Sequence, residues 1–90
     1  MSRFVVFYEP ADDVLTVGAP HMPAHSAHVD AAAQRGDLLA VGVFEDPQRH
    51  GSMCVLVSRE AAERFVREDP FVVHGVVRSH RILEWHDILA

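Results

Sequence analysis

The order of apolar runs and helical segments is the feature that most constrains the fold of this chain. Runs rich in β-branched and aromatic residues predict strands, and spacing with capping residues predicts helices. The predicted strands are residues 4–8, 38–44, 52–57 and 76–85, and the predicted helices are residues 20–36 and 58–68. This order predicts an α+β fold of the ferredoxin-like βαββαβ type, an antiparallel sheet with two helices on one face.

The segments between these elements are rich in turn-forming residues. Residues 9–19 show no clear period and predict a loop that precedes the first helix and is placed to cover a site. Residues 45–51 predict the turn of a hairpin, and residues 71–75 a connection to the last strand. Residues 38–44 predict a strand buried on both faces, where Gly42 indicates a bulge or a close approach of backbone or ligand.

The strands are apolar at nearly every residue, which is more than one helix-covered sheet face requires. We therefore expect the second face to pack on another copy of the chain and to form a homodimer, a dimeric α+β barrel. The length of 90 residues predicts a single domain over residues 1–90. A domain of this size buries a modest share of its surface, so dimerisation stabilises it further.

Composition argues against several classes of partner. The net charge is −5, with acids and bases mixed along the chain, which predicts no nucleic-acid or anionic-membrane surface. No apolar run approaches the roughly 20 residues of a membrane-spanning helix, and no signal-peptide pattern precedes the first strand. Cys54, the only cysteine, lies in an apolar run and predicts a buried, inert thiol. We expect a cytoplasmic protein.

Seven histidines in 90 residues are the unusual feature of the composition. In the first helix, an apolar stripe is predicted from the spacing of Met22, Val29, Ala33 and Gly36. His25 is expected at the edge of this stripe, with His21 and His28 further round the same side. An imidazole that faces a cleft, with one ring nitrogen held by a carboxylate, is a general acid/base. The alternative for His25 is a partly exposed histidine with a satisfied hydrogen bond.

Asp69 is the candidate carboxylate. It continues the inward face of the second helix, four residues after Phe65, and it lies at the C-terminal end, where the helix macrodipole disfavours an anion. A carboxylate in that position requires a cationic or hydrogen-bond-donating partner. The alternative is a turn residue before Pro70 that makes a local hydrogen bond. We predict that His25 and Asp69 meet in one pocket as the catalytic pair.

A metal site is the main alternative for the histidine cluster. His21, His25 and His28 fall within about 60° of one another round a helix, but His21 and His28 are two turns, roughly 10 Å, apart. That separation is too large for one ion, so only His21/His25 or His25/His28 would chelate. Further ligands would come from Asp69, from His74 or from a partner chain. The leading hypothesis includes no metal and no cofactor.

With these residues laid out, the chain resembles the YCII-related family of small bacterial proteins over nearly its whole length. The features that carry the resemblance are residues 4–8, Pro23-Ala24-His25, Gly36-Asp37-Leu38, Gly42, Gly51-Ser52, Ser58, Glu68-Asp69-Pro70-Phe71, Gly75 and Glu84-Trp85. The resemblance implies a dimeric α+β barrel with a site at His25 and Asp69. It also implies a link to ring-cleavage or dehalogenation pathways for aromatic compounds, in which the chemistry is proton transfer and elimination.

Two residues depart from the family pattern. Met22 stands where the family often has an arginine, and Val43 where it often has a proline. Without that arginine, the resemblance implies a weaker case for a carboxylate-bearing substrate, unless His21, His28 or Arg35 supplies the charge.

The leading hypothesis is an enzyme that uses His25, oriented by Asp69, as a general acid/base on a small cyclic organic molecule. The reaction would be a proton transfer of the isomerisation, elimination or dehydrohalogenation type. The residues predicted to contact this substrate are His21, His28, Gly42, Phe71 and Trp85, the two aromatic residues as apolar walls or, alternatively, as core. A second hypothesis is a non-catalytic module that binds a small molecule or metal at His21, His25 and His28. A third is a structural dimer with a vestigial site.

Overall fold

The computed structural model describes residues 2–89. The strands are β1 (Ser2–Pro10), β2 (Leu38–Val43), β3 (Ser52–Leu56) and β4 (Val77–His86). The helices are α1 (Val14–Gly18), α2 (Met22–Gln34), α3 (Pro47–His50), α4 (Arg59–Glu68) and α5 (Pro70–Val73), with a 3-10 turn η1 (Ala19–His21) between α1 and α2. Strand and helix order confirms the prediction for the main elements.

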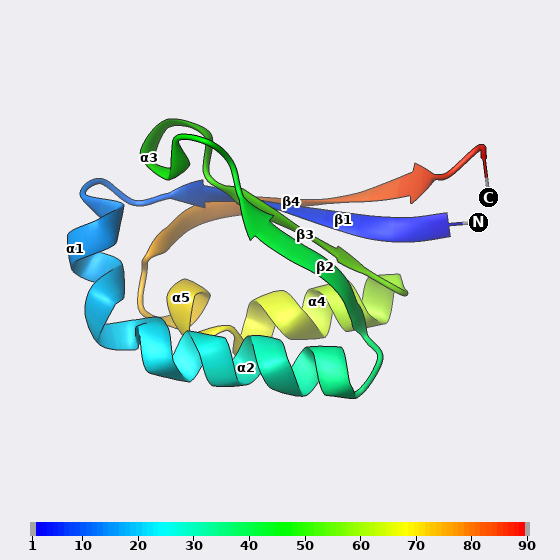
Figure 1. Cartoon of the computed structure of the whole chain (residues 1–90), viewed down its shortest axis with the longest axis horizontal. Coiled ribbons are helices and arrows are strands. Elements are labelled where there is room, and N and C mark those ends of the chain that lie inside the picture. The colour runs from blue at the N-terminus through cyan, green and yellow to red at the C-terminus, as the bar shows by residue number, and fades with distance from the viewer. Residues whose placement is uncertain (1, 90) are drawn as a thin grey trace.

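The strands form one antiparallel sheet in the order β2-β3-β1-β4. Helices α2 and α4 lie side by side on one face of this sheet, and the other face carries no long helix (Figure 1). Both chain ends lie at the same end of the molecule, where β1 and β4 pair along their length (Figure 1). The fold is the ferredoxin-like βαββαβ arrangement that the sequence predicts.

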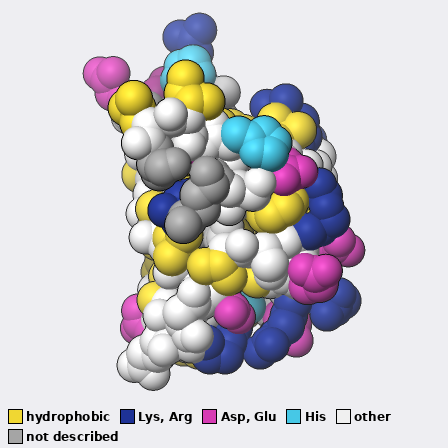
Figure 2. Space-filling view, turned by 90° about the vertical axis from the view of Figure 1, so that its right-hand side faces the viewer, with side chains coloured by type: hydrophobic (Ala, Val, Ile, Leu, Met, Phe, Trp, Pro, Cys, Tyr) yellow, Lys and Arg dark blue, Asp and Glu magenta, His cyan; other side chains and the backbone are white. Residues whose placement is uncertain are grey.

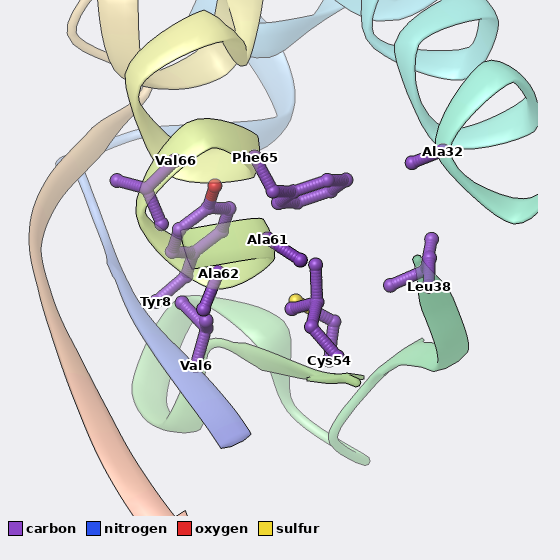
Figure 3. Packing of buried hydrophobic residues seen from close by; sticks show 10 residues of the cluster. Val6, Tyr8, Ala32, Leu38, Cys54, Ala61, Ala62, Phe65 and Val66 are labelled. Atoms are coloured by element: carbon purple, nitrogen blue, oxygen red, sulfur yellow. The ribbon is translucent and has the colours of Figure 1, made fainter. Parts of the chain in front are cut away.

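The core lies between the sheet and the two long helices. Its buried residues are Val6, Tyr8, Ala32, Leu38, Cys54, Leu56, Ala61, Ala62, Phe65 and Val66. In Figure 3 the ring of Tyr8 lies among them, with its hydroxyl at the edge of the cluster beside Val66. Cys54 is buried as expected, and burial together with the nearby charge of Asp69 raises the pKa of its thiol to about 12. The thiol is therefore inert at neutral pH.

Helix α4 follows directly from its sequence. The hydroxyl of Ser58 accepts a hydrogen bond from the backbone N–H of Ala61 at 3.0 Å, as an N-cap residue does. The inward residues are spaced at helical intervals and bury the same face. That face consists of Ala61, Ala62, Phe65 and Val66. These predictions are confirmed.

The predicted apolar stripe of the first helix is confirmed at Val29, which packs against the core, but its phase is otherwise wrong. In α2 the fully buried residue is Ala32, whereas Ala33 is exposed and Met22 is 49% exposed. Five alanines make this helix weakly amphipathic, so residue spacing alone does not determine its rotation about its axis. The rotation that packing selects turns His25 inward.

Residues 9–19 are not the predicted loop. Strand β1 extends to Pro10, Asp13 takes a left-handed conformation at φ 56°, and the chain then forms α1 and η1 before α2 begins at Met22. The carbonyl of Asp13 accepts hydrogen bonds from the N–H groups of Thr16 and Val17, which closes the first turn of α1. Short helices also replace the predicted turn at 45–51 and the predicted connection at 71–75, because Asp46 and Asp69 cap them.

Strand β2 corrects the prediction of burial on both faces. It is an edge strand in which Leu38 is buried and Leu39 to Val43 are exposed. Its irregular pairing lies between Leu38 and Ala40, so the predicted bulge is not at Gly42, which pairs with Met53. Edge strands have a neighbour on one side only, which leaves their apolar residues open.

The sheet face without helices is also apolar. Register and strand alternation place Val5, Phe7, Leu83 and Trp85 on it. Leu83 is 45% and Trp85 49% exposed.

Figure 2, which views the end of the molecule at right in Figure 1, shows basic and acidic side chains standing beside one another around apolar ones. Within residues 2–89, no helix is long and apolar enough to span a membrane.

Candidate functional site

Asp69 lies at the junction of α4 and α5. It is the residue after α4 ends, and its extended backbone (φ −71°, ψ 121°) makes it the N-cap of α5. Pro70 follows as the first residue of that helix. The backbone N–H at this position has no partner within a helix, so the missing N–H of proline costs nothing there. The Asp-Pro-Phe tripeptide therefore closes one helix and opens the next, and it holds the carboxylate between them. The predicted local hydrogen bond of Asp69 is present, and so is the predicted partner.

Three donors surround the buried carboxylate of Asp69, which has no exposed surface. Oδ1 accepts from His25 Nδ1 at 2.8 Å and from the backbone N–H of Phe71 at 3.0 Å, and Oδ2 accepts from the hydroxyl of Tyr8 at 2.8 Å. Burial acts to raise the pKa of Asp69, but these three hydrogen bonds and the adjacent imidazole outweigh it and hold the pKa below its usual value. The carboxylate is therefore ionised at neutral pH.

His25 is fixed on two sides. An ionised carboxylate only accepts hydrogen bonds, so Nδ1 of His25 carries the hydrogen and donates it to Asp69. The imidazole ring stacks on the ring of Phe71, with centroids 3.9 Å apart and an interplanar angle of 4°. Within residues 2–89, Nε2 has no hydrogen-bond partner, and the side chain is 17% exposed. Nδ1 is thus held in a hydrogen bond, and Nε2 is the ring nitrogen that can contact a ligand.

Tyr8 is a site residue that the sequence reasoning missed. Burial, followed by the charge of Asp69 and the hydrogen bond to it, raises the pKa of the Tyr8 phenol far above its usual value, so the hydroxyl stays a donor. A signal was present in the sequence: this is the only tyrosine, and it ends an otherwise apolar strand. A tyrosine in such a place usually needs a buried hydrogen-bond partner.

His25 opens onto a cavity of about 400 Å³ between α2 and the strands β2 and β3. We call it the His25 groove. Lining residues besides His25 include Ser26, Asp30, Val41, Gly42 and Phe71. Its size falls within the range of small-molecule sites, and its walls are mostly apolar. Of the predicted substrate contacts, the structure brings Gly42 and Phe71 to His25.

The other predicted contacts lie elsewhere. Nε2 of His28 donates to the backbone carbonyl of Phe65 at 2.9 Å. His21 stacks on His74, with ring centroids 4.2 Å apart. Trp85 is on the helix-free face of β4, opposite Arg3. None of the three lines the His25 groove.

The metal hypothesis requires a cluster of ligands, because one histidine alone does not hold an ion. Among residues 2–89, no group of three or more His, Cys, Asp or Glu side chains is placed to hold a metal ion. The arrangement is instead that of a histidine whose tautomer is fixed by a carboxylate and whose other ring nitrogen faces the groove.

The fold is shared with solved structures of low sequence identity. A 5-chloro-2-hydroxyhydroquinone dehydrochlorinase from Burkholderia phenoliruptrix, solved with 2,5-dihydroxybenzoquinone, aligns with a TM-score of 0.74 at 18% identity over 93% of each chain. An antibiotic biosynthesis monooxygenase aligns with a TM-score of 0.58 at 14% identity, over 98% of this chain and 99% of the other. A protein from Agrobacterium tumefaciens gives 0.58 at 7% identity, over 96% and 92%.

These neighbours have the fold of dimeric α+β barrel proteins, and at such identities the likeness shows the fold alone. No curated protein sequence matches the chain. The comparison with family models does identify the family, because the YCII-related domain matches residues 2–86, nearly the whole chain. The chain therefore belongs to the YCII-related domain family.

Proposed function

We propose that the protein is an enzyme in which His25, oriented by Asp69, transfers a proton on a small cyclic organic substrate in the His25 groove. One observation carries the proposal: the ring of His25 is held by a buried, ionised carboxylate at 2.8 Å and by a stacked Phe71, while Nε2 remains free beside a groove of about 400 Å³. A surface histidine has no need of a fully buried carboxylate partner.

The chemistry follows from the protonation states. Neutral His25 offers the lone pair of Nε2, which takes a proton from a carbon or hydroxyl of the substrate. The resulting imidazolium is stabilised by the negative charge of Asp69 at Nδ1. Return of the proton to another substrate atom completes an isomerisation. If instead the electrons of the broken C–H or O–H bond expel a halide, the reaction is a dehydrohalogenation, and solvent takes the proton from Nε2.

The structural neighbour supports the choice of reaction class. The dehydrochlorinase acts on a chlorinated, hydroxylated ring, by its name, and was solved with a benzoquinone. The two chains share the fold at 18% identity, so the neighbour suggests a substrate to try and does not assign one. A hydroxylated, halogenated six-membered ring is the first substrate class that we would test.

The test uses 5-chloro-2-hydroxyhydroquinone as probe, with chloride release and ring-hydrogen exchange in D₂O followed by NMR. His25→Gln keeps a hydrogen-bonding side chain but removes the base, and we expect a loss of about 10²–10⁴-fold in rate. His28→Gln is the matched control, since His28 lies one turn away on α2 and its ring also contacts a phenylalanine, tilted by 33° against Phe65. Equal rates for wild type and His25→Gln would refute the proposal, as would absence of turnover across a panel of halogenated and hydroxylated rings.

We propose further that the chain forms a homodimer through the helix-free sheet face. Support comes from the apolar residues of that face, of which Leu83 and Trp85 are about half exposed. Leu83→Glu places a charge in the centre of the proposed interface and is expected to give monomers in sedimentation velocity. Ala27→Glu, which adds the same charge at an exposed position of α2, is the control.

Two further expectations belong to this proposal. The family match over residues 2–86 supports a single domain over residues 1–90. The free, buried thiol of Cys54 supports a reducing cytoplasm as the location.

A further inference from the structure

A second cavity adjoins the His25 groove and has no part in the proton transfer proposed above. It measures about 470 Å³ and lies against α1, with Val14, Leu15 and Gly18 in its wall. We call it the α1 cavity. We propose that it binds an uncharged, apolar substituent of the substrate whose ring lies at His25. This inference rests on the proposed function, because it names the substrate class of the same site.

The two cavities share a wall. The residues that line both are Tyr8, Met22, Val43, Ser52 and Phe71. Phe71 spans the junction: its ring stacks on His25, and its Cζ lies 3.7 Å from where a Cβ on Gly18 would stand. A group attached to a ring at His25 therefore needs only to pass along Phe71 and Met22 to reach the α1 cavity.

The charge of the lining excludes an anionic occupant. The chain has no lysine, and within residues 2–89 no arginine lines either cavity. The acid in the lining of the His25 groove is Asp30, and the Tyr8 hydroxyl is already donated to Asp69. Among the described residues, the lining of the α1 cavity contains no charged side chain, and the Ser52 hydroxyl is the donor left in its wall. A carboxylate or phosphate there would lose its hydration without meeting a cation, so the occupant that fits is uncharged.

Size and surface point to a substituent of several carbon atoms. A cavity of about 150 Å³ accommodates benzene, and each of these cavities is larger than that. Met22 is 49% and Val43 71% exposed at the junction, so an apolar occupant would cover apolar surface that is now open. Met22 is flexible and adapts to the shape of such a group.

Three probes of related shape separate the possibilities: phenol, 4-propylphenol and 3-(4-hydroxyphenyl)propanoate. The glycine amides report where each binds in ¹H–¹⁵N NMR titrations. Gly18 and Gly51 line the α1 cavity, Gly42 lines the His25 groove, and Gly36 and Gly75 line neither. The first three amides therefore report occupancy, and the last two are internal controls.

We expect 4-propylphenol to shift the amides of Gly18, Gly51 and Gly42, and to bind about tenfold more tightly than phenol. Burying one methylene raises the affinity roughly fourfold, and the open cavity buries the propyl group only in part. The propanoate is expected to bind more weakly than 4-propylphenol. Ala19→Phe fills the α1 cavity and should remove the tenfold advantage, whereas Ala27→Phe, exposed on α2 and outside both cavities, should not.

Several outcomes would overturn the inference. They are equal affinity for phenol and 4-propylphenol, tighter binding of the propanoate, and a 4-propylphenol shift at Gly42 alone. Shifts of Gly18 and Gly51 that follow protein concentration and ignore the probe would show that a second copy of the chain covers the cavity. The proposed function fails separately: if 4-propylphenol binds as expected but His25→Gln turns over like wild type, the subsite stands and the proton transfer does not.

Discussion

His25 and His28 lie one turn apart on α2, and each holds one ring nitrogen in a hydrogen bond of nearly equal length. The ring of His25 stacks on that of Phe71 with centroids 3.9 Å apart, whereas the ring of His28 lies 4.5 Å from that of Phe65 and is tilted by 33°. The acceptor for His25 is the buried carboxylate of Asp69, whereas the acceptor for His28 is a backbone carbonyl. One lines a groove and the other does not.

The comparison shows what separates a candidate catalytic histidine from a structural one. A carbonyl dipole fixes the orientation of a ring but offers no full charge when the ring gains a proton. A carboxylate does both, and burial strengthens its effect because the local dielectric is low. The function that we propose therefore depends on the charge and burial of Asp69, and the experiments below alter these one at a time.

Removal of the carboxylate should have the largest effect. Asp69→Leu keeps the branched shape of the side chain but leaves the Tyr8 hydroxyl, the Phe71 N–H and His25 Nδ1 without an acceptor, each an unpaired buried group. We expect a loss of about 3 kcal/mol in the free energy of unfolding, measured in urea, and loss of turnover. His28→Leu, which leaves one carbonyl unpaired, should cost about 1 kcal/mol. Equal losses for the two variants would refute the comparison.

Neutralising the acceptor should give the next effect. Asp69→Asn places an amide carbonyl where His25 now meets a carboxylate, so His25 gains the kind of acceptor that His28 has. The amide fits, because both fixed donors point at Oδ1 and the group at Oδ2 is a hydroxyl that can rotate. We expect ¹⁵N NMR to show His25 still protonated at Nδ1, with turnover lowered by about 10–10²-fold. A change of tautomer would show that charge, not geometry, sets the orientation.

Acid should protonate Asp69, the hydrogen-bond acceptor of His25, whereas the backbone carbonyl that accepts from His28 does not titrate. The pKa of Asp69 is lowered in the folded protein, so the unfolded chain binds a proton first and stability falls as pH decreases. The contribution is complete above the usual aspartate pKa of about 3.9 and is lost as pH falls through the lower folded value, at no more than about 1.4 kcal/mol per pH unit. The measurement is the unfolding free energy of wild type minus Asp69→Asn at pH 7, 5, 4 and 3. A difference that does not change with pH would contradict a lowered pKa of Asp69 in the folded protein.

Loss of the Tyr8 hydroxyl should have the smallest effect. Tyr8→Phe keeps the ring in the core but leaves Oδ2 of Asp69 without a donor, which is worth about 1 kcal/mol in unfolding free energy. One fewer donor also raises the pKa of Asp69 in the folded protein. The acid-dependent loss of stability still begins near the usual aspartate pKa, but it should end at a higher pH and be smaller than in wild type. Phe7→Leu, on the helix-free face of the same strand, is the control. An unchanged acid transition would show that Tyr8 does not support the carboxylate.

Much of the fold was predictable because local signals and the global arrangement agree. The strands carry β-branched and aromatic residues, and Ser58 with the inward face of α4 specifies that helix without ambiguity. The short helices were missed because each has only four or five residues, too few for a period to show. They form at aspartate N-caps, or after a left-handed aspartate, and those depend on backbone angles that turn residues permit but do not require.

The candidate site was likewise predictable from the sequence only in part. Asp69 was identifiable because a carboxylate on the inward face at a helix end needs a partner. Tyr8 was missed because its place in an apolar strand indicates a need for a partner but does not identify that partner as Asp69, 61 residues away. Trp85 was expected beside the substrate, yet strand alternation and register put it on the opposite face of the sheet from Tyr8.

The sequence by itself determined the order of elements, the buried face of α4 and the position of the Asp-Pro-Phe junction, because these depend on neighbours a few residues apart. The sequence predicted His25 as the partner of Asp69, but only the tertiary structure decided the rotation of the helix that brings the two together. Helix α2 is rich in alanine, so its rotation depends on contacts with the sheet and with α5, and those contacts bring Ala32 inward and His25 to Asp69. The two cavities likewise exist only where α1, α2 and the edge of the sheet come together.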